Sequence, residues 1–332
     1  MDTFSLPILL LIFIASLTAL MKGADYMIEG ASKIAQRLGV SQLVIGLTVI
    51  ALGTSLPELV VSIQAAVNGK GSLALANVIG SNSTNILLVI GMTALLRPLT
   101  APSSLKKDEV PFSLALNVAF FVMVCVTADL YFGPGYMQSS SLIERWGGWV
   151  LLGFFAAFVG RLLKSGQKEE KEEVDEEAAA AGGSPLKAWL EVIVGCALVV
   201  GGGRFTVESA IGIARIMELS ETTIGITIVA FGTSLPELVA SVVAARKGFS
   251  DMAIGNVMGS NIMNLALVLG TAGAIAPIHV GAYEIIDIVF MTVVSLGFLG
   301  LIGRTKKPTI SRQTGAFFVV TYVLYMAYVA FR

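Results

Sequence analysis

Long apolar stretches alternate with short polar connections along the whole chain. Ten of these stretches are long enough to cross about 30 Å of hydrocarbon, which takes roughly 20 residues of helix. They lie near residues 4–22, 40–66, 72–96, 110–131, 146–163, 186–208, 219–245, 251–276, 284–303 and 313–331. The pattern therefore predicts an all-α membrane protein with ten transmembrane helices.

Two of the stretches, 40–66 and 219–245, are atypical because Gly, Thr, Ser, Pro and Glu interrupt them. Backbone polar groups inside a bilayer must be satisfied internally, so a broken helix survives there only where it is buried in protein or lines a cavity. We expect both stretches to form discontinuous helices near the membrane midplane and to mark the functional site.

The two broken stretches are copies of one segment. Shifting the sequence by 179 residues aligns 46–87 with 225–266 without a gap, and 22 of the 42 positions are identical. Each copy contains the string Gly-Thr-Ser-Leu-Pro-Glu-Leu, which begins at Gly53 and at Gly232. Because five stretches separate the copies, they enter the membrane from opposite sides. The sequence therefore predicts two inverted five-helix repeats, the architecture of many secondary transporters.

An acidic segment at 164–185 divides the chain into an N-terminal half, 1–163, and a C-terminal half, 186–332. Its run of like charges lacks the Asp-Gly loop of a folded calcium site, so we interpret it as a solvated linker. Most of the 22 Lys and Arg residues fall on the linker's side of the ten-helix arrangement. By the positive-inside rule this side is cytoplasmic, which places both termini outside the plasma (inner) membrane.

Composition excludes a soluble domain. The chain is 55% hydrophobic and only 14% charged, with a mean hydropathy of +0.82, whereas soluble domains are about 25% charged. A net charge of −1 provides no global field for nucleic acid. The two cysteines give no disulfide framework. The expected partner is the lipid bilayer, and the oligomeric state is left open.

Glu58 and Glu237 are the only acidic residues in the interior of the broken stretches, since Glu221 lies at the very start of the second, and no Lys or Arg lies in the middle of a predicted span. An unpaired carboxylate at the bilayer centre costs at least about 2.5 kcal/mol. Either protons or bound cations must neutralise the pair. Two carboxylates match the charge of one divalent cation or of two monovalent ones.

Neighbouring oxygens favour a cation. Helical spacing places further Ser and Thr side chains on the same faces as the two glutamates, and it places Asn and Ser side chains four residues apart on one face of the stretch that follows each. These are Thr54, Ser55, Ser62, Asn77, Ser81 and Asn85 in the first copy and Thr233, Ser234, Ser241, Asn256, Ser260 and Asn264 in the second. Pro57 and Pro236 cannot donate backbone hydrogen bonds, which frees the carbonyls of Gly53 and Gly232. Ligation by oxygen alone suits Ca²⁺ and Na⁺.

Not every repeated polar residue belongs to this face. Asn82 and Asn261 lie about 100° away from it on a helix, and we predict that they serve helix packing. Asn77 and Asn256 are open between two roles, because each could bind an ion or orient the broken backbone.

Both copies resemble the alpha repeats of the cation/calcium exchanger superfamily, and the whole ten-helix arrangement is similar to that of short prokaryotic sodium/calcium exchangers. The resemblance implies ion ligands at Thr54, Ser55, Glu58, Ser81 and Asn85 and at Thr233, Ser234, Glu237 and Ser260. It also implies that the backbone carbonyls of Ala51 and Ala230 bind Na⁺. Many members carry Asp at the position of Asn264, which we retain as a candidate ligand without a charge.

The expected function is therefore secondary antiport of Ca²⁺ against Na⁺ by alternating access, without covalent chemistry or a cofactor. By family analogy, the first and sixth segments move to expose the site to each side in turn. An antiporter of the same fold that uses H⁺ or another cation is the nearest alternative. A cation channel and a membrane interaction protein that transports nothing are more distant ones.

Overall fold

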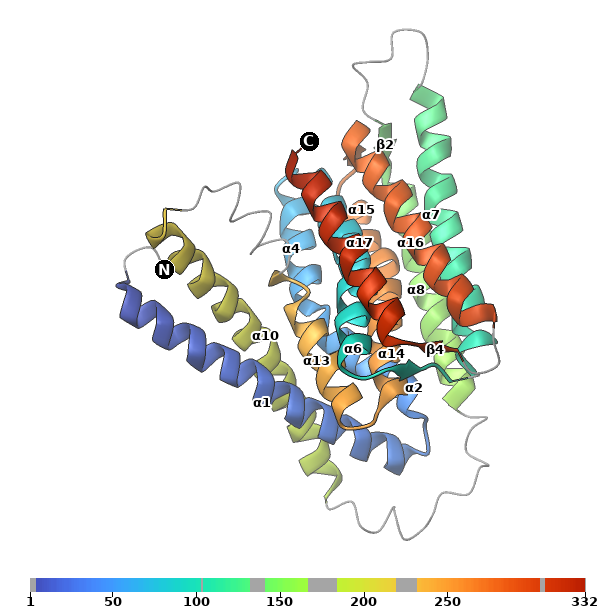
Figure 1. The fold of residues 1–332 in the computed structure, drawn as a ribbon. Helices are drawn as coiled ribbons and strands as arrows, with labels where there is room; N and C mark the ends of the chain where they lie inside the picture. Colours follow the sequence, from blue (N-terminus) through green and yellow to red (C-terminus); the bar gives the residue numbers. More distant parts are fainter. Residues whose placement is uncertain are drawn as a thin grey trace.

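The computed structural model describes residues 4–102, 104–131, 141–166, 184–218, 232–304 and 308–331. Helices dominate it, as the apolar pattern predicts (Figure 1). The helices are α1 Leu6–Leu38, α2 Gln42–Ile45, α3 Ala51–Thr54, α4 Leu56–Val67, α5 Gly71–Thr84, α6 Gly91–Leu96, α7 Glu109–Tyr131, α8 Arg145–Gly166, α10 Pro185–Ile216, α13 Leu235–Arg246, α14 Ser250–Met263, α15 Gly270–Ile275, α16 Ala282–Arg304 and α17 Arg312–Phe331. The acidic residues 167–183 lie outside the described part.

Seven described helical segments are long and apolar enough to cross a membrane, when Gly71–Leu96 and Ser250–Ile275 are each taken as one continuous segment. An eighth span follows if the bent pair Gln42–Thr54 and Leu56–Val67 counts as one. Helix α8 coincides with the predicted stretch 146–163, and α13 with the second part of the predicted stretch 219–245. Residues 219–231, the first part of that stretch, are outside the described residues. The chain is thus an all-helical protein with several membrane-spanning helices.

Helices α1 and α10 are longer than predicted. The first continues past residue 22 to Leu38, and α10 continues past residue 208 to Ile216. Glu29, expected in a connection, therefore lies inside α1. Lys22 and Arg204, which lie near the ends of the predicted stretches 4–22 and 186–208, are therefore well inside α1 and α10.

Two helical hairpins form the centre of the molecule. One joins α4 to α5 and the other joins α13 to α14, and their turns lie at opposite ends of the bundle (Figure 1). Beyond each hairpin, α5 continues through a π-helical turn, Asn85–Ile90, into α6, and α14 continues through Asn264–Leu269 into α15. These π-helical turns are equivalent under the 179-residue shift, so the two copies share even their irregular features.

Two small antiparallel sheets join the halves reciprocally. Strand β1 Leu99–Thr100, which follows α6, pairs with β4 Thr309–Ile310, which precedes α17. Strand β3 Ile278–Val280, which follows α15, pairs with β2 Ser141–Ile143, which precedes α8. Each half therefore supplies one strand to a sheet at either end of the bundle.

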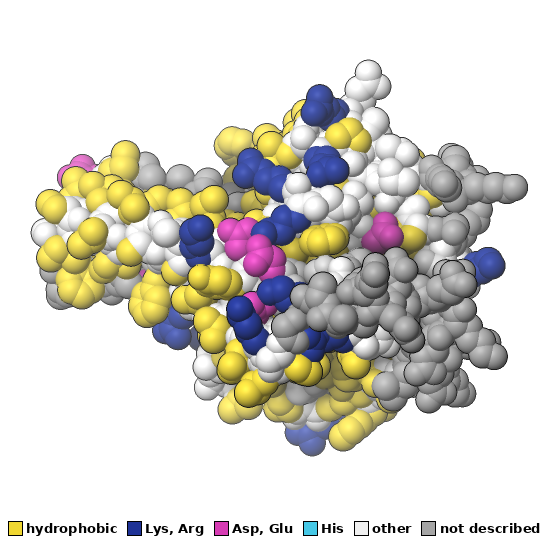
Figure 2. All heavy atoms as spheres, turned by 90° about the horizontal axis from the view of Figure 1, so that it is seen from below, with side chains coloured by type: hydrophobic (Ala, Val, Ile, Leu, Met, Phe, Trp, Pro, Cys, Tyr) yellow, Lys and Arg dark blue, Asp and Glu magenta, His cyan; other side chains and the backbone are white. Residues whose placement is uncertain are grey.

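The lower end in Figure 1 carries the turn between α13 and α14. Seen from below, this end displays a gathering of Lys and Arg side chains with a few acidic ones among them (Figure 2). Arg97, for example, donates from Nη1 to the carbonyl of Arg246 over 3.0 Å.

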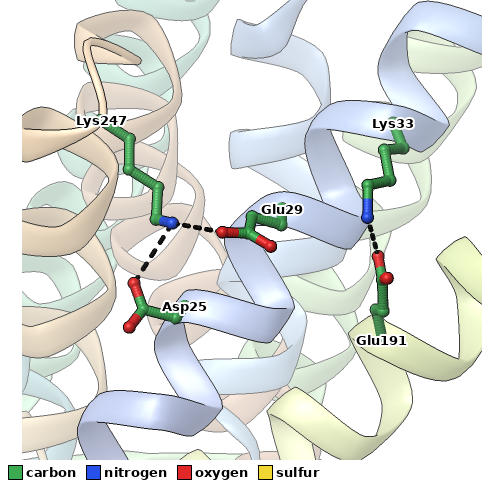
Figure 3. Close-up of polar contacts among 5 residues, drawn as sticks. All are labelled: Asp25, Glu29, Lys33, Glu191 and Lys247. Carbon is green, nitrogen blue, oxygen red and sulfur yellow. Dashed lines mark hydrogen bonds and ion pairs between the residues drawn. The ribbon is translucent and has the colours of Figure 1, made fainter. Parts of the chain in front are cut away.

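Helices α1 and α10 pack against each other as an antiparallel pair to one side of the centre (Figure 1). Ion pairs tie α1 to the lower end of the bundle and to α10 (Figure 3). The Nζ of Lys247, just after α13, lies 2.6 Å from Oε1 of Glu29 and 3.3 Å from Oδ1 of Asp25, both on α1. One turn further along α1, Lys33 pairs with Glu191 of α10 over 2.6 Å.

Candidate cation-binding site

In both copies a non-helical serine, two residues before the proline, precedes the helix that carries the glutamate. Ser55, between α3 and α4, has φ −85° and ψ 5°, and Ser234, before α13, has φ −89° and ψ 6°. In the first copy the two helical pieces are bent by 49°. Pro57 and Pro236 sit in the first turn of the following helix, where a missing N–H costs nothing. The proline therefore leaves no backbone N–H without a partner at the start of the helix. The glutamate follows directly after the proline.

Glu58 and Glu237 are fully buried. Oε1 of Glu58 accepts a hydrogen bond from the hydroxyl of Ser81 over 3.4 Å. Oε1 of Glu237 accepts one from the hydroxyl of Ser55 over 3.3 Å, so a ligand candidate of the first copy contacts the carboxylate of the second. The hydroxyl of Ser260 lies 3.5 Å from that of Thr54, the residue before Ser55, so it belongs to the same group of side chains. The structure thus brings both glutamates into one centre.

Asn77 and Asn256 hold the broken helices in place. The Nδ2 of Asn77 donates to Oγ of Ser62 over 3.0 Å, and the Nδ2 of Asn256 donates to Oγ of Ser241 over 3.0 Å. The same nitrogens lie 3.3 Å and 3.4 Å from the backbone carbonyls of Glu58 and Glu237, respectively. Of the two roles that the sequence leaves open, this geometry supports orientation of the backbone.

Thr54 adds a further contact between the copies. Its hydroxyl donates to Oδ1 of Asn256 over 3.2 Å and lies 3.4 Å from the carbonyl of Ala51, which also accepts from the N–H of Ser55. The Gly53 carbonyl lies 3.6 Å from the thiol of Cys196 on α10. The proline does free this carbonyl from the helix, but a thiol already contacts it.

Four asparagines meet where the copies cross. The Nδ2 of Asn82 donates to the backbone carbonyl of Asn261 over 3.2 Å, and that of Asn261 donates back to the carbonyl of Asn82 over 3.3 Å. The Nδ2 of Asn85 donates to Oδ1 of Asn261 over 3.0 Å, and that of Asn264 donates to Oδ1 of Asn82 over 3.1 Å. Asn82 and Asn261 do lie between helices, as predicted, but their contacts are hydrogen bonds to each other and to two ligand candidates.

Several buried oxygens of the candidate residues have no hydrogen-bond partner in the described part of the chain. They are Oε2 of Glu58, Oε2 of Glu237, Oγ of Ser234, Oδ1 of Asn85 and Oδ1 of Asn264. Buried polar atoms are nearly always paired, so a group of unpaired acceptors calls for a binding partner from outside the chain. Two carboxylates and several neutral oxygens form a set that a hard cation satisfies.

For two predicted ligands, Thr233 and Ala230, the structure gives less information. Thr233 is half-buried at the break of the second copy. Ala230 lies outside the described residues, so its carbonyl cannot be compared with that of Ala51.

The proteins that this chain resembles are consistent with a cation-binding centre. The sodium/calcium exchanger protein family matches residues 8–164 and 187–331, which is nearly the whole chain. The chain belongs to this family. It is 33% identical to the sodium/calcium exchanger MaX1 of Methanosarcina acetivorans, with 95% of this chain and 97% of the relative covered. It is 32% identical to the inner membrane protein YrbG of Escherichia coli, with 95% of both chains covered.

Solved structures of the same family share the fold. The sodium-calcium exchanger NCX_Mj, in a crystal soaked with Na⁺ and Sr²⁺, matches with a TM-score of 0.81 at 28% identity, covering 97% of this chain and 99% of the other. This exchanger-family chain is therefore an integral membrane antiporter for ions, as the resemblance of its alpha repeats implies.

Proposed function

We propose that the protein exchanges Ca²⁺ for Na⁺ across the membrane through the site around Glu58 and Glu237. The observation that carries this proposal is the group of buried, unpartnered oxygens on both copies, which surrounds two carboxylates with neutral acceptors. Oxygen ligation of this kind favours Ca²⁺ and Na⁺ over softer metals.

The ligands we propose combine the two copies. They are Glu58, Thr54, Ser55, Ser81, Asn85 and the carbonyl of Ala51 from the first, and Glu237, Thr233, Ser234, Ser260, Asn264 and the carbonyl of Ala230 from the second. The two formal charges balance one Ca²⁺ or two Na⁺. The two ions then compete for the same carboxylates, so occupation by one excludes the other and couples their fluxes. No cofactor takes part, and no covalent step makes the protein an enzyme.

The architecture that we propose has ten helices in two inverted halves, 1–163 and 186–332, joined by the acidic linker 164–185. The hairpin turns at opposite ends of the bundle, the reciprocal sheets and the 179-residue repeat support the inversion. We place the basic end of Figure 2 in the cytoplasm with the linker, because positively charged connections are retained there. Both termini are then outside the plasma (inner) membrane.

Transport into sodium-loaded vesicles tests the proposal. The purified protein is reconstituted, the vesicles are loaded with Na⁺ and diluted into choline, and uptake of radioactive Ca²⁺ is followed. We expect uptake to require the outward Na⁺ gradient and to stop when choline replaces Na⁺ inside. Uptake that ignores Na⁺ but follows a pH gradient would assign the protein to Ca²⁺/H⁺ exchange, and uptake without any counter-ion would make it a channel.

A further inference from the structure

The four central asparagines form a closed network. Asn82, Asn85 and Asn264 are fully buried, and Asn261 completes the set. Each half supplies two of them, and all four hydrogen bonds run between the halves. The network therefore joins the ends of α5 and α14, next to the candidate ligands Ser81 and Ser260.

The orientation of every amide in this network is determined. A side-chain amide can usually be reversed, because its oxygen and nitrogen have similar shapes. Here the Nδ2 atoms of Asn82 and Asn261 face backbone carbonyls, which only accept hydrogen bonds. Their Oδ1 atoms must then face the other way, towards Asn264 and Asn85, and accept from the Nδ2 atoms there. Reversing any one amide would set two acceptors against each other.

The orientation of the amides determines which atoms of Asn85 and Asn264 are free to contact the ion. With their nitrogens held by the network, Asn85 and Asn264 keep Oδ1 as the free end, and both oxygens are buried without a partner. A reversed amide would present an NH₂ group, which repels a cation and cannot ligate it.

We propose that Asn82 and Asn261 are positioning residues, which hold the amide oxygens of Asn85 and Asn264 towards the transported ion. The inference rests on the proposed function, because it assumes that an ion occupies the centre. It assigns a role in ion affinity to two residues that do not themselves bind the ion. Because the bonds are reciprocal, each half of the protein sets the ligand geometry of the other.

Kinetics of the variants Asn82→Ala, Asn261→Ala and the double variant test this assignment. We expect each single variant to raise the KM for Ca²⁺ at least about 10-fold, the lower limit usual for residues that orient metal ligands, while the maximal rate changes much less. Because the network acts as a unit, the double variant should be little worse than either single one. Asn82→Ser, which keeps a small acceptor and donor, should recover part of the affinity.

Ser83→Ala is the matched control. Ser83 is fully buried beside Asn82, its hydroxyl has no partner among the described residues, and the second copy has Ile262 at this position. We expect its KM for Ca²⁺ to stay at the wild-type value. An unchanged KM in Asn82→Ala and Asn261→Ala, with normal exchange by the wild type, would overturn the positioning role alone. If the wild type itself does not exchange Ca²⁺ for Na⁺, the proposed function is what fails.

Discussion

The centre of the molecule and the attachment of its α1–α10 pair follow different rules. In the centre, the contacts of the asparagines recur under the 179-residue shift almost unchanged, although Ser55 bonds to Glu237 while the hydroxyl of Ser234 has no partner among the described residues. The amide of Asn77 lies 3.0 Å from Ser62, and that of Asn256 lies 3.0 Å from Ser241. The reciprocal bonds of the central asparagines differ by only 0.1 Å between the copies, at 3.2 and 3.3 Å for one pair and 3.0 and 3.1 Å for the other.

The ion pairs of α1 and α10 are not repeated. Lys247 bridges α13 to α1 at the lower end, but its counterpart in the first copy is Asn68, whose side chain donates to the Gln64 carbonyl of its own helix over 2.8 Å. On α10 the counterpart of Glu29 is Glu208, which pairs over 2.7 Å with Arg204 of the same helix. In the described part of the chain, the charged bridge thus exists at one end only.

The difference separates two tasks. A site that is opened to each side in turn needs two equivalent halves, so its ligands and their supports recur. If α1 moves during transport, a bridge present at one end stabilises the arrangement in which it is formed and shifts the populations towards that arrangement. We therefore expect substitutions in the centre to affect binding strongly, and substitutions in the bridge to affect rates slightly.

Substitution of the two buried carboxylates should have the largest effect on transport. Replacing Glu58 or Glu237 by Gln removes half of the charge that neutralises the ion. We expect either variant to lower Na⁺-dependent Ca²⁺ uptake by at least about 100-fold, because a buried divalent cation left with one charge is under-compensated by several kcal/mol. The measurement is the vesicle assay with equal amounts of protein.

Glu208→Gln is the control for these variants, because Glu208 is partly exposed and pairs within α10. It should transport at close to the wild-type rate. Retained exchange in both Glu58→Gln and Glu237→Gln would remove the site from this centre.

A substitution that disturbs the packing between the two copies should have the next largest effect, and this effect is on stability. A Cβ added at Gly259 of α14 would lie 2.6 Å from the carbonyl oxygen of Leu47, in the helical stretch between α2 and α3. We expect Gly259→Ala to destabilise the protein by about 1–3 kcal/mol, as overpacking of a tight contact does. Thermal unfolding of the purified protein in detergent measures the change.

Gly297→Ala on α16 serves for comparison, since no described atom beyond the adjacent residues and the nearby backbone of its own helix lies within 4 Å of a Cβ added there. Alanine is the better helix former, so this variant should be as stable as the wild type or slightly more stable. Equal melting temperatures for the Gly259 and Gly297 variants would show that the centre is not as tightly packed as described.

The sequence predicts the centre better than the periphery for a physical reason. Glu58 and Glu237 stand out because a carboxylate in an apolar stretch is costly, and the repeat shows that neither is accidental. The task of Asn82 and Asn261 could not be predicted, because the angle between residues on one helix says nothing about which helix lies opposite. That partner became visible only with the crossing of α5 and α14.

The length of α1 could not be predicted from the sequence for a similar reason. Asp25, Glu29 and Lys33 ended the apolar stretch at residue 22, since charges usually mark the end of a span. In the folded chain these residues pair with Lys247 and Glu191, so the helix continues through them. A hydropathy profile of the sequence does not show whether a charge is neutralised by a residue far away along the chain.

The smallest effect should come from the bridge. Partial burial lowers the pKa of Lys247, but its bonds to Glu29 and Asp25 outweigh this and leave the pKa above its ordinary value, so the bridge is intact at neutral pH. Half-exposed ion pairs contribute up to about 1 kcal/mol, which corresponds to about a five-fold change in rate. If α1 must leave Lys247 during transport, Lys247→Asn, which copies Asn68, should raise the maximal exchange rate about two- to five-fold at low salt.

The salt dependence makes this prediction specific. Exposed charge pairs are screened at high ionic strength, so the rates of the wild type and of Lys247→Asn should converge in about 1 M choline chloride, where the Debye length is about 3 Å. The KM for Ca²⁺ should be the same in both proteins, because the bridge does not touch the ion site. A changed KM with an unchanged maximal rate would reverse the comparison, since the one-sided contact would then belong to the binding centre and not to the movement of α1.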